Sequence, residues 1–206
     1  NGQHKLTGGF TNTFSYKGIT LRLLFDFKSG ANLLSMTNMK LYQYGAHINT
    51  LKGREEWATS EAERIAQNKT TAAWIATGGY KADAVTADGF NEDGSVKYKQ
   101  NEVFVNPKDY WSNIANNQIL SPYVFDASYI KLREVSLSYN FPETIIKKLK
   151  VFRSAALSIT ARNLFVLSRI PNVDPESTYS INNGQGYEYG ALPQRSSFGF
   201  NLNCKF

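Results

Sequence analysis

Two stretches of the sequence alternate strictly between apolar and polar residues, and this alternation limits the possible folds more than any other feature. In ITLRLLFDFK, residues 19–28, apolar side chains share one face and polar ones the other, with Leu24 as the single exception. In SSFGFNLNCKF, residues 196–206, the alternation continues to the last residue and places Cys204 among the apolar side chains. A period of two residues is that of a β-strand with one apolar and one polar face.

Five strands are predicted in all, at about 5–17, 18–30, 123–141, 154–167 and 195–206. The first two meet at Gly18, which supplies the permissive backbone of a short hairpin. Within the third, Ile130 and Leu132 fall on the opposite parity from Val135 and Leu137. One shift of phase near Arg133 predicts a β-bulge there.

The connections between the predicted strands alternate between short and long. The long ones are loops at about 31–122 and 170–194, and the first contains one predicted helix over 54–68. Outer-membrane barrels have short periplasmic turns and long extracellular loops. We therefore expect both loops to be extracellular and the C-terminus to be periplasmic.

Composition agrees with a membrane barrel. Charged residues make up 19% of the chain and aromatic residues 14%, whereas about a quarter of the residues of a soluble domain are charged. No apolar run approaches the roughly 18 residues of a transmembrane helix, but barrel strands are only half apolar, so a mean hydropathy of −0.38 fits them. The predicted fold class is all-β, a transmembrane antiparallel β-barrel.

Five strands cannot close such a barrel, for which roughly eight is the smallest number. The sequence also starts on Asn-Gly-Gln-His without an initiator methionine. We therefore expect residues 1–206 to be the C-terminal portion of a longer barrel protein.

Several function classes have little support. The net charge of +6 is spread along the chain rather than gathered in a patch, which argues against nucleic-acid binding. His4 and His47 are isolated, residues 88–94 lack the spacing of a calcium loop, and Cys204 is the single cysteine. No catalytic motif is present, so we expect no enzyme activity, metal site or cofactor.

Four motifs occur in order: YIKLREVSLSYNFP at 129–142, ARNLF at 161–165, DPES at 174–177 and ALPQRSSFGFNLNCKF at 191–206. Together they resemble the end of the SusC/RagA family, the TonB-dependent outer-membrane transporters of Bacteroidetes. The resemblance covers residues 121–206 firmly and 5–30 loosely. It implies the last strands of a twenty-two-stranded barrel in outer-membrane lipid.

The resemblance also implies partners and a function. A SusD-type lipoprotein would act as a lid outside the barrel, and a plug domain would close the lumen. The plug and the segment that contacts TonB would both lie upstream of Asn1. Family members import oligosaccharides or oligopeptides across the outer membrane.

Three groups of residues are candidates for a functional site, and each also has a simpler structural interpretation. Residues predicted to face the lumen contact the plug or the substrate, or form a solvated, mutually paired barrel wall: Arg22, Asp26, Lys28, Glu134 and Arg162. Aromatic residues of the loops contact substrate or partner, or pack the loops' own core: Trp57, Trp74, Tyr110, Trp111, Tyr187 and Tyr189. Residues of the last strand form a signal for barrel assembly, or belong to a lipid-facing strand that ends there: Phe198, Phe200, Leu202 and Phe206.

Two rival functions share parts of this pattern. A soluble carbohydrate-binding β-sandwich would have the alternation and the aromatic residues, but it would also have evenly spaced turns. A β-rich hydrolase needs a pair of carboxylates or a triad at strand ends, and none is identifiable.

Overall fold

The computed structural model describes residues 1–149, 151–180, 182 and 184–206. They form two compact units, which we describe separately. The first consists of Asn1–Thr37 and Tyr123–Phe206, and the second of Asn38–Pro122.

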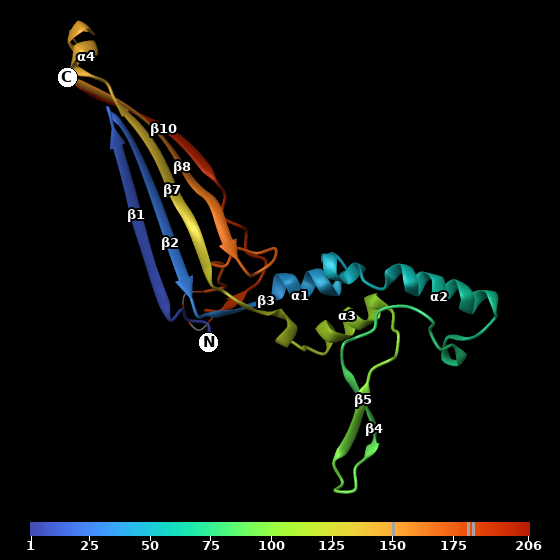
Figure 1. Cartoon of the computed structure of the whole chain (residues 1–206). Coiled ribbons are helices and arrows are strands. Elements are labelled where there is room, and N and C mark those ends of the chain that lie inside the picture. Colours follow the sequence, from blue (N-terminus) through green and yellow to red (C-terminus); the bar gives the residue numbers. More distant parts are fainter. Residues whose placement is uncertain (150, 181, 183) are drawn as a thin grey trace. The chain divides into compact units, whose positions relative to one another are not determined.

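The first unit is built on a five-stranded antiparallel sheet in the order β1-β2-β7-β8-β10 (Figure 1). Its strands are β1 (Leu6–Tyr16), β2 (Ile19–Ser29), β7 (Tyr129–Asn140), β8 (Ser154–Ser168) and β10 (Ser197–Lys205). The expected strand at 123–141 is divided, because Val124–Asp126 forms a separate strand, β6, that pairs with β3 (Asn32–Ser35) in another sheet.

The short connections of the large sheet have simple local causes. Between β1 and β2, Lys17 and Gly18 both have positive φ angles, of 46° and 85°. Two consecutive positive φ angles define the tight hairpin turn whose twist matches antiparallel strands. Between β7 and β8, Pro142 ends the strand and the short helix α4 (Glu143–Leu149) follows.

The predicted bulge at Arg133 is confirmed. The register of β2 against β7 shifts between Leu24 and Phe25, and the register of β7 against β8 shifts between Leu132 and Glu134. Arg133 is thus the extra residue that lets Ile130 and Leu132 share a face with Val135 despite their opposite parity.

A small three-stranded sheet, in the order β6-β3-β9, completes the first unit, with β9 at Tyr187–Glu188. A compact apolar core of Ala31, Leu33, Ala127 and Ile170 lies in the same unit. Glu188 is fully buried, and its carboxylate accepts hydrogen bonds from the hydroxyls of Ser35 and Thr37. These bonds fix the loop that leads into β10.

The second unit contains more regular structure than the single predicted helix. That helix is present as α2 (Arg54–Ala66), and α1 (Met36–Gln43), α3 (Pro107–Asn116) and a hairpin of β4 (Val85–Phe90) and β5 (Val96–Gln100) accompany it. Short 3-10 turns occur at Ile48–Leu51, Thr71–Ala73 and, in the chain before β6, Ser121–Tyr123. None of the helices in the described part of the chain combines the length and apolar character needed to cross a membrane.

Candidate functional site

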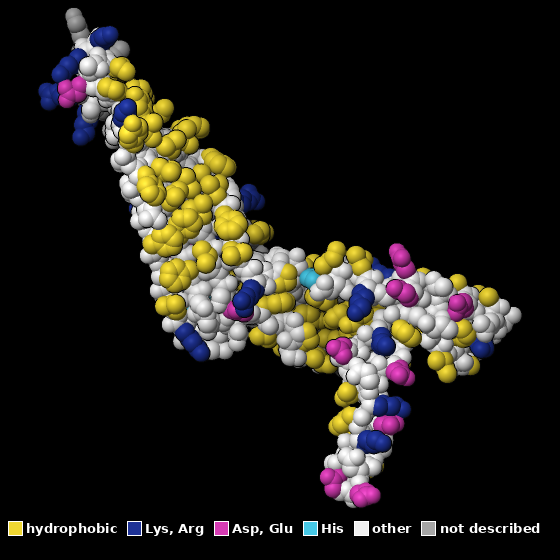
Figure 2. All heavy atoms as spheres, viewed as in Figure 1, with side chains coloured by type: hydrophobic (Ala, Val, Ile, Leu, Met, Phe, Trp, Pro, Cys, Tyr) yellow, Lys and Arg dark blue, Asp and Glu magenta, His cyan; other side chains and the backbone are white. Residues whose placement is uncertain are grey.

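One face of the five-stranded sheet is apolar from edge to edge. The register places Phe10 opposite Phe25, Phe25 opposite Leu132, and Leu132 opposite Phe165. The rings of Phe10 and Phe25 stack with 4.8 Å between their centroids. A second row joins Leu137, Ile159 and Phe200. Figure 2 shows hydrophobic side chains covering this sheet.

Much of this apolar face is exposed in the structure. Phe198 and Phe200 on β10 have exposed fractions of 71% and 79%. Further large apolar residues on the same face are also exposed: Phe14, Ile19, Ile130, Leu137, Leu157, Ile159, Phe165 and Leu202. Exposed apolar patches of this extent mark a surface that contacts lipid or another protein.

The opposite face of the sheet carries a group of three charges. Glu134 of β7 accepts a hydrogen bond of 3.0 Å from Nε of Arg162 on β8, and Nη1 of Arg22 on β2 lies 3.8 Å from its other oxygen. The structure thus brings together three of the five residues predicted to face the lumen. All three lie on the polar face, where one carboxylate is shared between two guanidinium groups.

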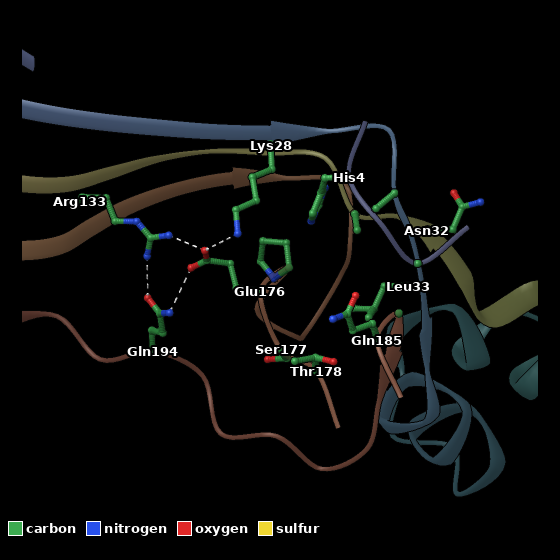
Figure 3. Close-up of a pocket in the computed structure, with 15 residues that line it drawn as sticks. His4, Lys28, Asn32, Leu33, Arg133, Glu176, Ser177, Thr178, Gln185 and Gln194 are labelled. Atoms are coloured by element: carbon green, nitrogen blue, oxygen red, sulfur yellow. Dashed lines mark hydrogen bonds and ion pairs between the residues drawn. The ribbon is translucent and has the colours of Figure 1, made fainter. Parts of the chain in front are cut away.

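The other two predicted residues, Asp26 and Lys28, belong to a second and more buried network. Nζ of Lys131 lies 2.7 Å from a carboxylate oxygen of Asp174 and 2.7 Å from one of Glu176. Nε of Arg133 donates to Asp26 at 2.8 Å, and the same guanidinium also bonds Glu176. In Figure 3, Glu176 lies between Arg133 and Lys28, and Gln194 faces both Arg133 and Glu176. We call these residues the charge network: Asp26, Lys28, Lys131, Arg133, Asp174, Glu176 and Gln194.

Five members of the charge network are absent from the predicted site: Lys131, Arg133, Asp174, Glu176 and Gln194. Lys131 and Arg133 belong to the first of the four motifs, and Asp174 and Glu176 are the two carboxylates of DPES. The available signal was that these two motifs carry charges of opposite sign. Their pairing links the N-terminal part of β7 to the loop that precedes β10.

Electrostatics holds Glu176 in its ionised form. Burial alone would raise the pKa of its carboxyl, but hydrogen bonds from Arg133, Lys131 and Tyr129 outweigh burial and hold the pKa at about 2. Within its own turn, Asp174 accepts a hydrogen bond of 2.9 Å from the backbone N–H of Glu176. Each buried charge of the network therefore has an opposite charge as partner, which a buried ion pair requires.

A cavity of about 490 Å³ adjoins the charge network (Figure 3). His4, Lys28, Arg133, Glu176 and Gln185 are among its lining residues. Burial and the nearby Lys28 charge lower the pKa of His4, so its imidazole is neutral at pH 7. Most of the side chains that line the cavity are polar or charged.

The six predicted loop aromatics do not form one cluster. Trp57 and Trp111 line a cavity of about 550 Å³ in the second unit, which we call the aromatic cavity. The ring of Tyr110 contacts that of Trp111 at 4.9 Å, whereas Trp74 donates a hydrogen bond to Ser60. In the first unit, Tyr187 lies in β9 and Tyr189 is exposed.

The residues of the predicted assembly signal lie on β10 or directly after it. Phe198, Phe200 and Leu202 are on the apolar face, and β10 is an outermost strand of the described sheet, paired with β8. Phe206 is exposed, and its ring lies 5.1 Å from that of Phe152. Whether these residues guide assembly stays a prediction.

Comparison with known proteins identifies the relatives of the chain. No family model matches it. It is 33% identical over 99 residues to TonB-dependent receptor P3 of Formosa agariphila, which covers 45% of the chain and 10% of that receptor. TonB-dependent receptor P39 of the same organism is 24% identical over 212 residues, 100% of the chain and 16% of the receptor.

Solved structures give the same answer for the fold. The RagAB peptide importer in its closed-closed state matches with a TM-score of 0.58 at 16% identity, over 100% of this chain and 18% of that one. A structure of the RagAB peptide transporter matches with a TM-score of 0.55 at 17% identity, over 100% of this chain and 17% of that one. The resemblance to the SusC/RagA family is confirmed.

The match is to one part of each of these proteins. The aligned segments cover 10% and 16% of the lengths of the two Formosa receptors. At 16–17% identity, the likeness to the RagAB structures concerns the fold alone.

Proposed function

We propose that residues 1–206 form the C-terminal portion of the barrel of a TonB-dependent transporter that imports nutrients across the outer membrane. The observation that carries the proposal is the two-faced sheet. Its apolar face is exposed from β1 to β10, and its opposite face carries the charges of Arg22, Glu134 and Arg162. A barrel wall between lipid and a hydrated lumen needs these two faces.

The exposed apolar face also weighs against the β-sandwich. A sandwich buries one face of each sheet against the other, in a core about 10 Å thick. Among the described residues of the first unit no second sheet covers this face, since its large apolar side chains are exposed. Lipid is the solvent that suits such a face.

The connections support an orientation for the barrel. One end of the sheet carries the tight turn at Gly18 and the α4 connection, and the other carries the long segments at about 31–122 and 170–194. Short turns are periplasmic in outer-membrane barrels and long loops are extracellular. We therefore assign the C-terminus to the periplasm and both loops to the cell exterior.

The complete transporter would have further parts and partners. Its plug and the segment that contacts TonB would precede these residues, and a SusD-like lipoprotein would act as a lid over the extracellular loops. The substrates would be oligosaccharides or oligopeptides. The work is gated binding and release, to which the polar face, the charge network and the loop aromatics contribute contacts.

Cysteine labelling of the full-length transporter in lipid vesicles tests the two faces. In a Cys204→Ser background, Phe200→Cys and Asn201→Cys place a thiol on adjacent residues of opposite faces. We expect a lipid-confined thiol reagent to label Phe200→Cys, and a water-soluble maleimide to label Asn201→Cys. Equal labelling of both positions by the water-soluble reagent would show that the sheet does not face lipid.

Uptake by whole cells tests the transport function. We expect accumulation of an oligosaccharide or oligopeptide substrate to require both TonB and the energised inner membrane. Uptake that continues at the same rate without TonB would exclude TonB-dependent import.

A further inference from the structure

The aromatic cavity of the second unit has a lining of unusual composition. Its walls include Tyr42, Tyr44, Trp57 and Trp111, and its charged residues are Arg54 and Lys108. The remaining lining residues are small or neutral and polar: Gln43, Gly45, Thr50, Asn106, Pro107, Ser112 and Asn116. The lining therefore contains two cations and no carboxylate.

Contacts with neighbouring residues fix two of its aromatic walls. The ring of Tyr42 stacks on His47 at 4.1 Å and also contacts Trp111 at 4.5 Å. Its hydroxyl accepts a hydrogen bond of 2.7 Å from Asn49. At Trp57, the close approach of Gly79 leaves no room for a Cβ atom, which would lie 2.9 Å from the indole ring. Walls that are held in place lose little conformational entropy when a ligand binds.

Arg54 is positioned without being neutralised. Its guanidinium donates to the backbone oxygens of Thr50 and Gly45 and to the Thr50 hydroxyl, at 2.7–2.8 Å. All three acceptors are neutral, and no carboxylate of the described residues forms an ion pair with Arg54. Gly45 has a positive φ of 72°, which favours glycine, and a Cβ atom there would lie 2.7 Å from Nη2 of Arg54 and displace the guanidinium.

Lys108 is the second cation. It lies in the first turn of α3 and has no ion-pair partner among the described residues. Asp109 is in the same turn but is not part of the cavity lining. The hydrogen bonds from Arg54 to Gly45 and Thr50 explain Arg54 as a structural residue. They give no reason for a second unpaired cation at the same cavity.

We propose that the aromatic cavity binds a sugar ring that carries a carboxylate, as in a uronate residue of an acidic oligosaccharide. The apolar face of the ring would stack on the aromatic walls, and its carboxylate would pair with Arg54 and Lys108. The amide nitrogens of Asn106 and Asn116 suit its hydroxyl groups, because the oxygens of these amides already accept bonds from the backbone N–H of Lys108 and from Gln43. This assignment rests on the proposed import function and names its substrate class.

The geometry favours a sugar over a peptide. The lining residues come from α1, the segment 44–50, α2, and α3 with its N-terminal cap, and none comes from a strand. Extended peptides are commonly captured by adding a strand to an exposed sheet edge. No strand edge borders this cavity.

Calorimetric titration of the full-length transporter in detergent, without TonB, tests the site. The probes are trigalacturonate, its fully methylated ester and a tripeptide with a free carboxylate. We expect trigalacturonate to bind about tenfold more tightly than the ester, which corresponds to about 1.4 kcal/mol. Lys108→Gln should weaken trigalacturonate binding about threefold, half of this free-energy difference, and leave ester binding unchanged.

Two further variants control for folding. Lys52→Gln removes the same charge from an exposed residue outside the cavity lining and should leave binding unchanged. Tyr44→Ala should weaken both sugars, because Tyr44 is 77% exposed and its loss removes a wall without disturbing a core. Arg54→Gln would also remove the hydrogen bonds that hold residues 45–50, so Lys108→Gln is the decisive variant.

The inference fails if trigalacturonate does not bind, if the acid and the ester bind equally, if Lys108→Gln has no effect, or if the tripeptide alone binds. These results are separate from a failure of the proposed function. Loss of TonB-dependent uptake with intact trigalacturonate binding would contradict import alone. TonB-dependent uptake of a neutral substrate without trigalacturonate binding would contradict this site alone.

Discussion

Lys131 of β7 and Asp174 of the loop after β8 form a nearly buried ion pair, with 2.7 Å between Nζ and Oδ1 and exposed side-chain fractions of 4% and 9%. The two residues are 43 positions apart in the sequence. The same ammonium group also contacts Glu176. One lysine therefore holds two carboxylates of the last loop against the polar side of β7.

The first prediction concerns this lysine. Lys131→Met would leave two carboxylates without their shared cation, and breaking a buried pair costs about 3–5 kcal/mol. We expect faster hydrogen–deuterium exchange in residues 171–194 and a lower melting temperature in detergent. Lys147→Met is the matched control, because its ion pair with Glu143 is exposed; equal losses in both variants would contradict the structural role of Lys131.

The second prediction concerns pH. The pKa of Glu176 is about 2 in the folded chain, against an ordinary value of 4.5. A depressed pKa stabilises the fold above pH 4.5, and this contribution disappears as the pH falls from 4.5 to 2. The difference amounts to about 3 kcal/mol at about 1.4 kcal/mol per pKa unit.

Glu176→Gln isolates this contribution. The free energy of unfolding of the variant should be lower than that of the wild type at pH 6, and the two should converge as the pH approaches 2. Denaturant titrations at several pH values measure the difference. A difference that does not change with pH would mean that the ionisation of Glu176 does not stabilise the fold.

The third prediction compares the two faces of β2. Phe25→Arg places a charge on the apolar face and should cost about 2–4 kcal/mol if the residue lies near mid-membrane. Phe25→Ser removes lipid-facing area and should also lower stability. Arg22→Ser should change stability little, because the Arg22 side chain is half exposed and lies 3.8 Å from Glu134. Melting of the barrel in detergent gives all three values, and equal losses at Phe25 and Arg22 would argue against the assigned faces.

The fourth prediction concerns Phe206. Its ring is exposed apart from the contact with Phe152, so deleting it should cost no more than roughly 1–3 kcal/mol. If the last strand guides assembly, however, the full-length protein without Phe206 should reach the outer membrane poorly and still refold normally in detergent. Lys205→Ala leaves the apolar face intact and should assemble as the wild type does. Normal assembly of the deletion variant in cells would leave only the lipid-facing role of the strand.

The strands, the turn at Gly18 and the bulge at Arg133 were accessible from the sequence because each is encoded locally. Alternation with a period of two needs only neighbouring residues, and a change of parity between Leu132 and Val135 marks the bulge. The charge network was not accessible, because Lys131 and Asp174 meet only after β8 has folded back along β7.

The second unit shows another limit of local patterns. Its hairpin, β4 and β5, has a register shift between Ala87 and Phe90 that interrupts the alternation. The N-terminus of α3 did carry a local signal, since Asn106 caps the helix and Pro107 takes its first position. That signal lies near Trp111, whose ring contacts Tyr42. Tyr42 is far away in the sequence, so local patterns do not reveal this contact.

The bulge at Arg133 changes which residues of β7, those at odd or those at even positions, lie on the apolar face. Between the pair Glu134–Arg162 and the pair Leu132–Phe165, β7 has one residue and β8 has two. Loss of Arg133 alone would leave Ile130 and Leu132 on the apolar face and match β7 to β2 without a bulge, but Asn163 and Leu164 of β8 would then face no residue of β7. Exchange of this strand between related transporters therefore requires Arg133 and the Asn163–Leu164 pair to be transferred together.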